Sequence, residues 1–329
     1  MIVFVILNRV NNLKTKRRFD FAQRDSLFTI FVIMKLYSIN TGNFKLDGGA
    51  MFGVVPKSIW NKTNPADENN MISMAMRALL IEDGNKLILI DNGMGTKQDA
   101  KFFSYYYMHG DDTLEKSLAK HGFSPDDITD MFLSHLHFDH CGGSVKRKSP
   151  SLTLPEGKGT NFELTFKNAT YWSNEEHWNW ATHPNKREKA SFLSDNILPI
   201  KESGQLKFIS PPKTDDELAS LPFGEGWGGA LFSRGHTDAM MHPHIKYKGK
   251  TIVYIADLLP TVGHIPLPYV MGYDTRPLIT LDEKEKFMNK AAEEEFILFL
   301  EHDPINECCT VQKTEKGIRL KESFSLEEL

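Results

Sequence analysis

The stretch Ser134-His135-Leu136-His137-Phe138-Asp139-His140-Cys141-Gly142-Gly143 places four potential metal ligands within six residues, at the end of the strand-like run ITDMFLS (128–134). Histidine and aspartate are costly to bury without partners, so packing alone explains this stretch poorly. Side chains two apart on an extended loop project to one side, so His135 and His137 can share one ion. Asp139 and His140 then turn toward a second ion, and the two glycines permit a tight turn beside them.

Four ligands cannot complete two coordination spheres, so further ligands are expected downstream. Three candidates follow strand-like runs: His236 after ALFSRG (230–235), Asp257 at the end of TIVYIAD (251–257), and His302 within FILFLEHD (296–303). Sheets of α/β proteins present ligand-binding residues at the ends of their strands. Taken singly, each candidate is as typical of a turn or a structural hydrogen bond, but the set predicts one metal centre.

The seven predicted ligands divide between two ions that share one of them. We assign His135, His137 and His236 to the first ion, Asp139, His140 and His302 to the second, and Asp257 to a bridging position. Imidazole and carboxylate without thiolate suit two zinc ions, although iron, manganese or cobalt also fit. Such a pair would hold a hydroxide, because metal binding lowers the pKa of water toward about 7. Asp91 either orients a metal-bound histidine or stabilises its own turn.

Composition limits the class of protein and of partner. The chain has 329 residues and ordinary globular balance, enough for one large domain or two small ones. A net charge of −4 argues against nucleic acid as the main partner and favours a small, weakly charged substrate. No apolar run approaches the roughly 20 residues that span a bilayer. Three cysteines, two of them adjacent, predict a reducing, cytoplasmic location rather than a disulfide framework. A homodimer is left open.

The chain divides into an N-terminal extension and one domain. In residues 1–33 the apolar MIVFVIL precedes the basic cluster, the reverse of a secretory signal, so we predict an upstream extension with Met34 as the working start. The alternative is a genuine but poorly ordered tail. Residues 34–329 mix strands and helices, including a predicted helical stretch at 99–121, which indicates layered α/β architecture. Residues 146–212 are aromatic, charged and mostly helical in pattern, and are predicted to be an insertion over the site.

Taken together, the segments HLHFDH (135–140), GH (235–236), AD (256–257) and EH (301–302) resemble the metallo-beta-lactamase superfamily over residues 34–310. DGGAMFGVVPKSIW (47–60), RALLI (77–81), LILIDNGMG (87–95) and ADLLPTVGHIPLPYVMGYD (256–274) are similar to its quorum-quenching N-acyl-homoserine lactonases and their methyl-parathion-hydrolase-like relatives. The resemblance implies a four-layer αβ/βα sandwich with a dinuclear site at one edge. It also implies that a metal-bridging hydroxide, with Asp139 and Asp257 in the catalytic set, opens the lactone ring.

One departure from these lactonases concerns the proton donor. The lactonases that it resembles carry a tyrosine three residues after the bridging aspartate, where this chain has Pro260. His264, Tyr269 and Tyr273 follow closely and are the candidate donors, although each is equally typical of a packing residue.

An acyl chain needs an apolar wall beside the metals, because large aromatic and aliphatic side chains bury the most area. The candidates for that wall are Met51, Phe52, Tyr105, Tyr106, Tyr107, Phe138 and Trp172, of which two or three are expected to line a pocket. The remaining ionisable candidates, His177, His183, His242 and His244, are interpreted as structural or surface residues, and Cys141 as a small buried residue.

Two other functions fit the same ligands. The first is hydrolysis of a phosphotriester or another ester, since the same hydroxide can attack phosphorus or carbon. The second belongs to another class, a metal-binding scaffold without turnover, which the intact seven-ligand set argues against.

Overall fold

The computed structural model describes residues 34–148, 162–214, 216–224 and 226–329, so the predicted extension at 1–33 lies outside the described residues. Two six-stranded sheets dominate it. The first has the order β1 (Lys35–Asp47), β2 (Met71–Asp83), β3 (Lys86–Ile90), β4 (Asp130–Phe132), β7 (Thr170–Ser173), β8 (Leu206–Phe208). The second has the order β14 (Gly317–Phe324), β13 (Cys308–Thr314), β12 (Ile297–Phe299), β11 (Lys250–Tyr254), β10 (Met240–Tyr247), β9 (Trp227–Ser233). A separate two-stranded sheet pairs β5 (Val145–Arg147) with β6 (Phe162–Leu164).

The period-2 alternation of apolar residues in the first sheet creates two cores. On β2 and β3, Leu79, Ile81 and Ile88 share one apolar cluster with residues of the second sheet. The alternate residues Leu80 and Leu89 face the other way and pack with helical residues. Because successive strand side chains point to opposite faces, one strand sequence can serve both cores.

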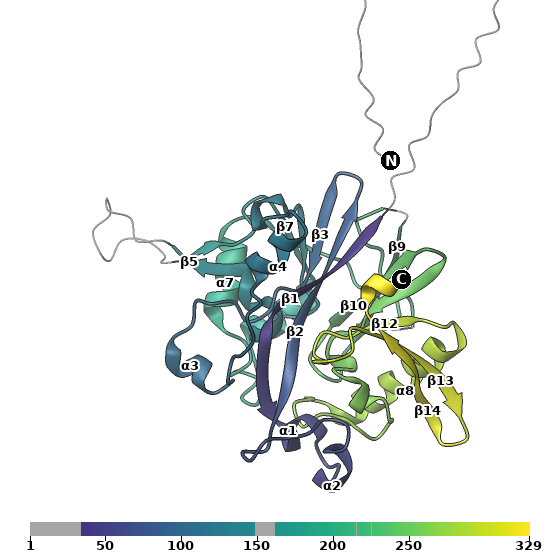
Figure 1. The fold of residues 1–329 in the computed structure, drawn as a ribbon. Helices are drawn as coiled ribbons and strands as arrows, with labels where there is room; N and C mark the ends of the chain where they lie inside the picture. The colour runs from purple at the N-terminus through teal and green to yellow at the C-terminus, as the bar shows by residue number, and fades with distance from the viewer. Residues whose placement is uncertain (1–33, 149–161, 215, 225) are drawn as a thin grey trace, which may run out of the picture. The chain divides into compact units, whose positions relative to one another are not determined.

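Helices cover the outer faces of both sheets (Figure 1). On the first sheet lie α4 (Leu114–Lys120), α6 (Glu175–Thr182) and α7 (Ser194–Glu202), which bury residues such as Leu118 and Ile197. The long α8 (Pro277–Glu293) packs on the second sheet through Phe287 and Met288. The predicted four-layer αβ/βα sandwich is therefore confirmed. None of the helices in the described ranges combines the length and the apolar character needed to cross a membrane.

Two predicted segments differ from the structure. Residues 146–212 hold α6 and α7, but they also supply β7 and β8 to the first sheet, so this part of the predicted insertion is integral to the fold. Its aromatic residues explain the difference, because Tyr171 and Trp172 are alternating strand residues rather than helical ones. Residues 149–161 lie outside the described ranges. The predicted helix at 99–121 is broken into α3 (Ala100–Ser104) and α4, with Tyr107 (φ 45°) and Gly110 (φ 85°) between them.

Short elements complete the described fold. They are the helices α1 (Gly48–Phe52), α2 (Lys57–Trp60) and α5 (Phe138–Cys141), and the 3-10 turns η1 (Pro125–Asp127), η2 (Gly142–Ser144), η3 (Ala256–Leu258), η4 (Val262–His264) and η5 (Leu326–Glu328).

Candidate metal centre and its cavity

All seven predicted ligands are buried at the strand ends of the two sheets. The 135–140 segment follows β4, His236 follows β9, Asp257 lies in η3 after β11, and His302 follows β12. Close backbone packing fixes the first loop. A Cβ on Gly142 would lie 2.2 Å from the Met94 carbonyl oxygen, so only glycine lets these backbones approach so closely.

The donor atoms of the first predicted set converge on one point. His137 Nδ1 lies 3.0 Å from His135 Nε2 and 3.1 Å from His236 Nε2, and Asp257 Oδ2 lies 3.0 Å from His236 Nε2. Donors sharing one tetrahedral zinc at bond lengths of about 2.0–2.1 Å stand roughly 3.4 Å apart. These four residues therefore have the spacing of a single coordination sphere.

The second set converges beside the first. His302 Nε2 lies 3.1 Å from His140 Nε2 and 3.8 Å from Asp139 Oδ2. Asp257 touches this set as well, at 3.2 Å from His302 Nε2 through Oδ1 and 3.3 Å from His140 Nε2 through Oδ2. One carboxylate thus stands between the two groups of imidazoles, the position that a bridging ligand occupies.

The protonation of the rings follows from the partner of each ring's other nitrogen. His236 Nδ1 faces Asp274 Oδ1 at 2.9 Å, His302 Nδ1 faces the Ala75 carbonyl at 2.8 Å, and His137 Nε2 faces Glu188 Oε1 at 3.0 Å. These oxygens can only accept, so each of these nitrogens carries the hydrogen. His140 Nδ1 likewise faces Asp91 Oδ2 at 3.1 Å and Glu301 Oε2 at 2.9 Å.

The ring nitrogens that face the other donors therefore carry lone pairs when the rings are neutral. Lone pairs about 3 Å apart repel one another, whereas a cation between them turns the repulsion into coordination. Asp257 Oδ1 adds to the mismatch, because it is buried and no described residue donates a hydrogen bond to it. The residues therefore fit bound metal ions on their own chemistry, and their outer partners are the acceptors that typically orient metal-binding histidines.

The electrostatics of the cluster favour positive charge. Burial opposes charging of His236, but attraction by Asp257 and hydrogen bonds to Asp257 and Asp274 raise its pKa to about 10. Burial likewise opposes charging of His302, yet Asp257 and Glu301 raise its pKa to about 9. Burial acts to raise the pKa of Asp257, but His140, His236 and His302 hold that pKa well below its ordinary value. Asp257 stays ionised, so the field around it attracts cations.

His177 supports the 135–140 loop but is not one of the predicted metal donors. Burial lowers the pKa of His177 to about 4, so its ring is neutral. Its Nε2 accepts a hydrogen bond from the Leu136 backbone N–H at 2.8 Å, and its Nδ1 donates to the Asp238 carbonyl at 2.5 Å. His177 therefore fixes the backbone between His135 and His137.

A cavity of about 390 Å³ opens directly over the donors. Five of the seven predicted ligands line it: His137, Asp139, His236, Asp257 and His302. Apolar side chains form the opposite part, namely Leu46, Met51, Met74, Tyr106, Phe138 and Met271, and polar groups come from Arg187, Glu188, Ser191, Tyr273 and Thr275. Its volume falls within the range of small-molecule sites, about 300–1,000 Å³.

Comparison with known proteins agrees with this geometry. The model of the metallo-beta-lactamase superfamily matches residues 77–146, which include the 135–140 segment. The chain carries a metallo-beta-lactamase superfamily domain. Its fold is similar to that of a probable metal-dependent hydrolase from Staphylococcus aureus (TM-score 0.76, 26% identity, 91% of this chain and 99% of that chain). It is also similar to AidC, a dizinc quorum-quenching lactonase in complex with a product (TM-score 0.68, 25% identity, 90% and 97%).

Curated relatives of this metallo-beta-lactamase domain are lactonases. The N-acyl homoserine lactonase AiiB of Agrobacterium fabrum is 28% identical over 117 residues, which cover 33% of this chain and 42% of that protein. The N-acyl homoserine lactonase of Bacillus thuringiensis is 25% identical over 122 residues, covering 34% and 44%. The matched stretch thus spans less than half the length of these curated relatives.

The structure corrects four of the residues predicted to line the apolar wall. Phe52 does not line the cavity, because its ring is taken up by stacking on Trp60 and on His264. Tyr105 is 60% exposed and does not line the cavity. Trp172 packs on Phe223 between the sheets, since it is a strand residue of β7. Tyr107, half exposed, is absent from the lining as well.

Two of the three predicted proton donors are also misplaced. His264 is buried outside the cavity, where its Nε2 faces the Met51 carbonyl at 3.0 Å and its Nδ1 contacts Thr261. Tyr269 packs edge-on against Phe52. Only Tyr273 lines the cavity.

Sequence reasoning missed several partners of the donors. Asp274 and Glu301 lie in segments that the sequence analysis had already quoted, and they contact His236 and His140. Their carboxylates, close in sequence to predicted ligands, could have marked them. Glu188 had no such signal, because nothing in RE (187–188) marks its position beside His137.

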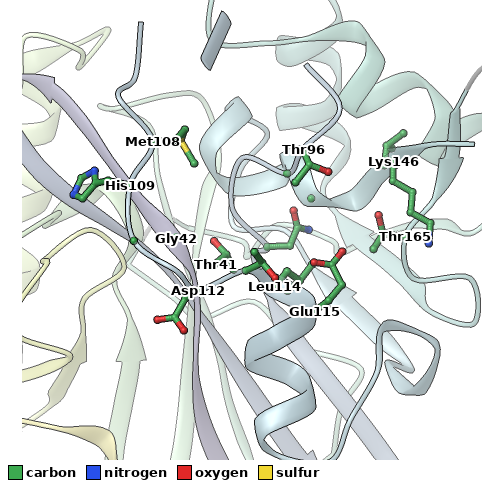
Figure 2. A pocket seen from close by; sticks show the side chains of 16 residues that line it. Thr41, Gly42, Thr96, Met108, His109, Asp112, Leu114, Glu115, Lys146 and Thr165 are labelled. Carbon is green, nitrogen blue, oxygen red and sulfur yellow. The ribbon is translucent and has the colours of Figure 1, made fainter. Parts of the chain in front are cut away.

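A separate cavity of about 190 Å³ shares no lining residue with the metallo-beta-lactamase site (Figure 2). Thr41, Thr96, Glu115 and Thr165 are among its lining residues, and none of the seven predicted ligands is.

Proposed function

We propose that this protein is a dinuclear zinc hydrolase that opens the lactone ring of N-acyl-homoserine lactones. The observation that carries the proposal is the cavity itself, where a converging set of metal donors faces an apolar wall within about 390 Å³. A reactive polar head group and an apolar chain are the two parts of such a substrate. The lactonases named above supply the substrate class.

The residues divide into three roles in this proposal. The five histidines, Asp139 and Asp257 would hold two ions, which when bound supply Lewis-acid polarisation and an activated water for attack on an ester carbonyl. Asp139 lines the cavity and is placed to take up the proton that the attacking water loses. Asp274, Glu188, Asp91 and Glu301 orient the rings.

The apolar wall suits an unbranched acyl chain. Three of its members, Met51, Met74 and Met271, are methionines, whose flexible thioether side chains adapt to irregular ligands. We therefore propose that acyl chains of several lengths are accepted.

We also propose a cytoplasmic location. The three cysteines are buried and unpaired, which fits a cytoplasmic protein. A homodimer fits the chain equally well as a monomer, and the mass in solution decides between them.

Turnover and metal content together test the function. The zinc-loaded full chain should hydrolyse N-hexanoyl- and N-decanoyl-homoserine lactone faster than paraoxon, and should contain about two zinc ions per chain. His236→Ala should abolish turnover, whereas His183→Ala, at an exposed histidine outside the cluster, should leave it unchanged.

Two outcomes would replace this function with another. A rate advantage for paraoxon alone would indicate a phosphotriesterase. One zinc ion or none, without turnover of any ester, would indicate a scaffold.

A further inference from the structure

Two tyrosines contribute phenolic hydroxyls to the cavity. Tyr106 and Tyr273 both contribute to its lining together with Asp257 and His302. Across the described residues, neither phenolic oxygen has a hydrogen-bond partner in the protein, and the two side chains are near enough to each other and to Asp139 to interact electrostatically. Tyr106 is partly buried and Tyr273 is 40% exposed, so both hydroxyls stay available beside the metal donors to a molecule that enters the cavity.

The backbone turns Tyr106 inward at a conformational cost. Its neighbours Tyr105 and Tyr107 are 60% and 50% exposed. The Tyr106 ring instead packs against Phe138 and Phe102, with ring centroids 4.8 Å and 5.0 Å apart. Tyr107 adopts φ 45°, a conformation that non-glycine residues rarely hold without compensation. The Tyr106 carbonyl accepts a hydrogen bond from the Lys45 backbone N–H at 2.7 Å, which ties the segment to β1.

Tyr273 is held by the same network that orients a metal donor. Asp274 accepts from the Met271 backbone N–H through Oδ2 at 3.1 Å and faces His236 Nδ1 through Oδ1 at 2.9 Å. The Gly272 N–H donates to the Ala50 carbonyl at 2.8 Å. The position of Tyr273 is therefore coupled to that of His236.

Three other polar groups of the cavity are less suited to donate a proton. Glu188 is engaged by His137 and Trp180, and the Thr275 hydroxyl donates to the His236 carbonyl at 3.1 Å. Ser191 has an aliphatic hydroxyl, which is no more acidic than an alcohol product. A phenol, with an ordinary pKa near 10, is far more acidic than an alcohol.

We propose that Tyr106 and Tyr273 are the catalytic acids of this site, and that they deliver a proton to the oxygen that leaves the ester carbonyl. The proposal rests on the proposed lactone hydrolysis. Burial raises the pKa of each phenol to about 12, so both carry their proton at neutral pH and can still protonate an alkoxide.

The step balances without another reactant. A water oxygen bonds to the carbonyl carbon and releases one proton to Asp139. The bond from that carbon to the ring oxygen then breaks, and its electron pair stays on the ring oxygen, which takes the phenolic proton. Asp139 then gives up the proton that it took from water, and the phenolate takes one up. Both groups return to their starting state, and one water and one lactone give one hydroxy acid.

The test compares leaving groups. Tyr106→Phe, Tyr273→Phe and the double variant are assayed on N-hexanoyl-homoserine lactone, on an alkyl ester and on a 4-nitrophenyl ester. The double variant should lose at least about tenfold in kcat on the lactone and the alkyl ester, and less than about threefold on the nitrophenyl ester, whose leaving group needs no proton. Tyr105→Phe, at the exposed neighbouring phenol, should change none of the rates.

The outcomes separate the two proposals. If the native protein hydrolyses the alkyl ester but not the lactone, the lactonase function fails while the ratio of alkyl-ester to aryl-ester rates still tests the phenols. An unchanged ratio in a double variant with native zinc content would overturn the assignment, and so would equal losses on all substrates.

Discussion

Replacing Glu188 with glutamine should weaken metal binding by changing the tautomer of His137. Both carboxylate oxygens of Glu188 face N–H groups: Oε1 faces His137 Nε2 at 3.0 Å, and Oε2 accepts from Trp180 Nε1 at 2.7 Å and Asn185 Nδ2 at 3.0 Å. A glutamine must turn its NH2 toward one of these two sides. If it faces His137, Nε2 becomes the acceptor and the hydrogen moves to Nδ1, the nitrogen that points at the other donors.

Either orientation is costly. Loss of a partner that orients a metal-bound histidine typically costs 10- to 100-fold in metal affinity, or about 1.4–2.7 kcal/mol. The alternative leaves the two partly buried N–H groups of Trp180 and Asn185 facing an NH2, and an unsatisfied group costs at most about 1–3 kcal/mol. We therefore expect one of two results for Glu188→Gln. Either the zinc ion that it holds less tightly binds at least about tenfold more weakly, or the free energy of unfolding falls by an equivalent amount.

Competition with a chromophoric chelator measures the two zinc affinities, and urea unfolding of the zinc-free protein measures the second cost. Glu175→Gln, at an exposed glutamate of helix α6, is the control for the change of charge and should match the native protein in both. Native zinc affinities and a native unfolding midpoint in Glu188→Gln would refute the tautomer argument.

Three further predictions follow from other parts of the structure. Burial lowers the pKa of Lys284 to about 7, so between about pH 7 and 10 the unfolded state binds more protons than the folded state. The free energy of unfolding should therefore rise with pH, by at most about 1.4 kcal/mol per pH unit from this group. Urea unfolding at pH 7.5 and 9 should show a smaller rise in Lys284→Met, and an equal rise in both proteins would contradict this. Gly142→Ala should destabilise the fold by about 1–3 kcal/mol, because the new Cβ meets the Met94 carbonyl, and a native melting temperature would contradict it. Met74→Trp should fill part of the cavity and lower kcat/KM for decanoyl more than for butanoyl homoserine lactone, whereas equal losses would place the acyl chain elsewhere.

The positions of the metal donors were predictable because of their chemistry. Residues such as His135 and Asp257 are expensive to bury unpaired, and each directly follows an apolar run that can only be a buried strand. Strand ends of a sandwich share an edge, so the order of segments alone brought distant residues together. The mixture of strands and helices predicted layered α/β architecture, whereas the four layers were implied by the resemblance to the metallo-beta-lactamase superfamily.

The apolar wall was less predictable, because its side chains lie on short or irregular elements. Tyr105, Tyr106 and Tyr107 are identical in sequence, and only a left-handed residue after the second decides which one turns inward. Trp172 looked like a cavity residue until its strand placed it between the sheets. Glu188 meets His137 through a loop, and no local pattern encodes that distance.

The donors are contributed by both halves of the sandwich, with the 135–140 segment on the first sheet and His236, Asp257 and His302 on the second. Bound metal ions would therefore cross-link the two halves of the sandwich. A chain cleaved between β8 and β9 has every donor of one half on one fragment and the rest on its complement, so we expect the fragments to reassemble with zinc and to separate when a chelator strips it. Occupancy of the site would then report on the cohesion of the whole domain.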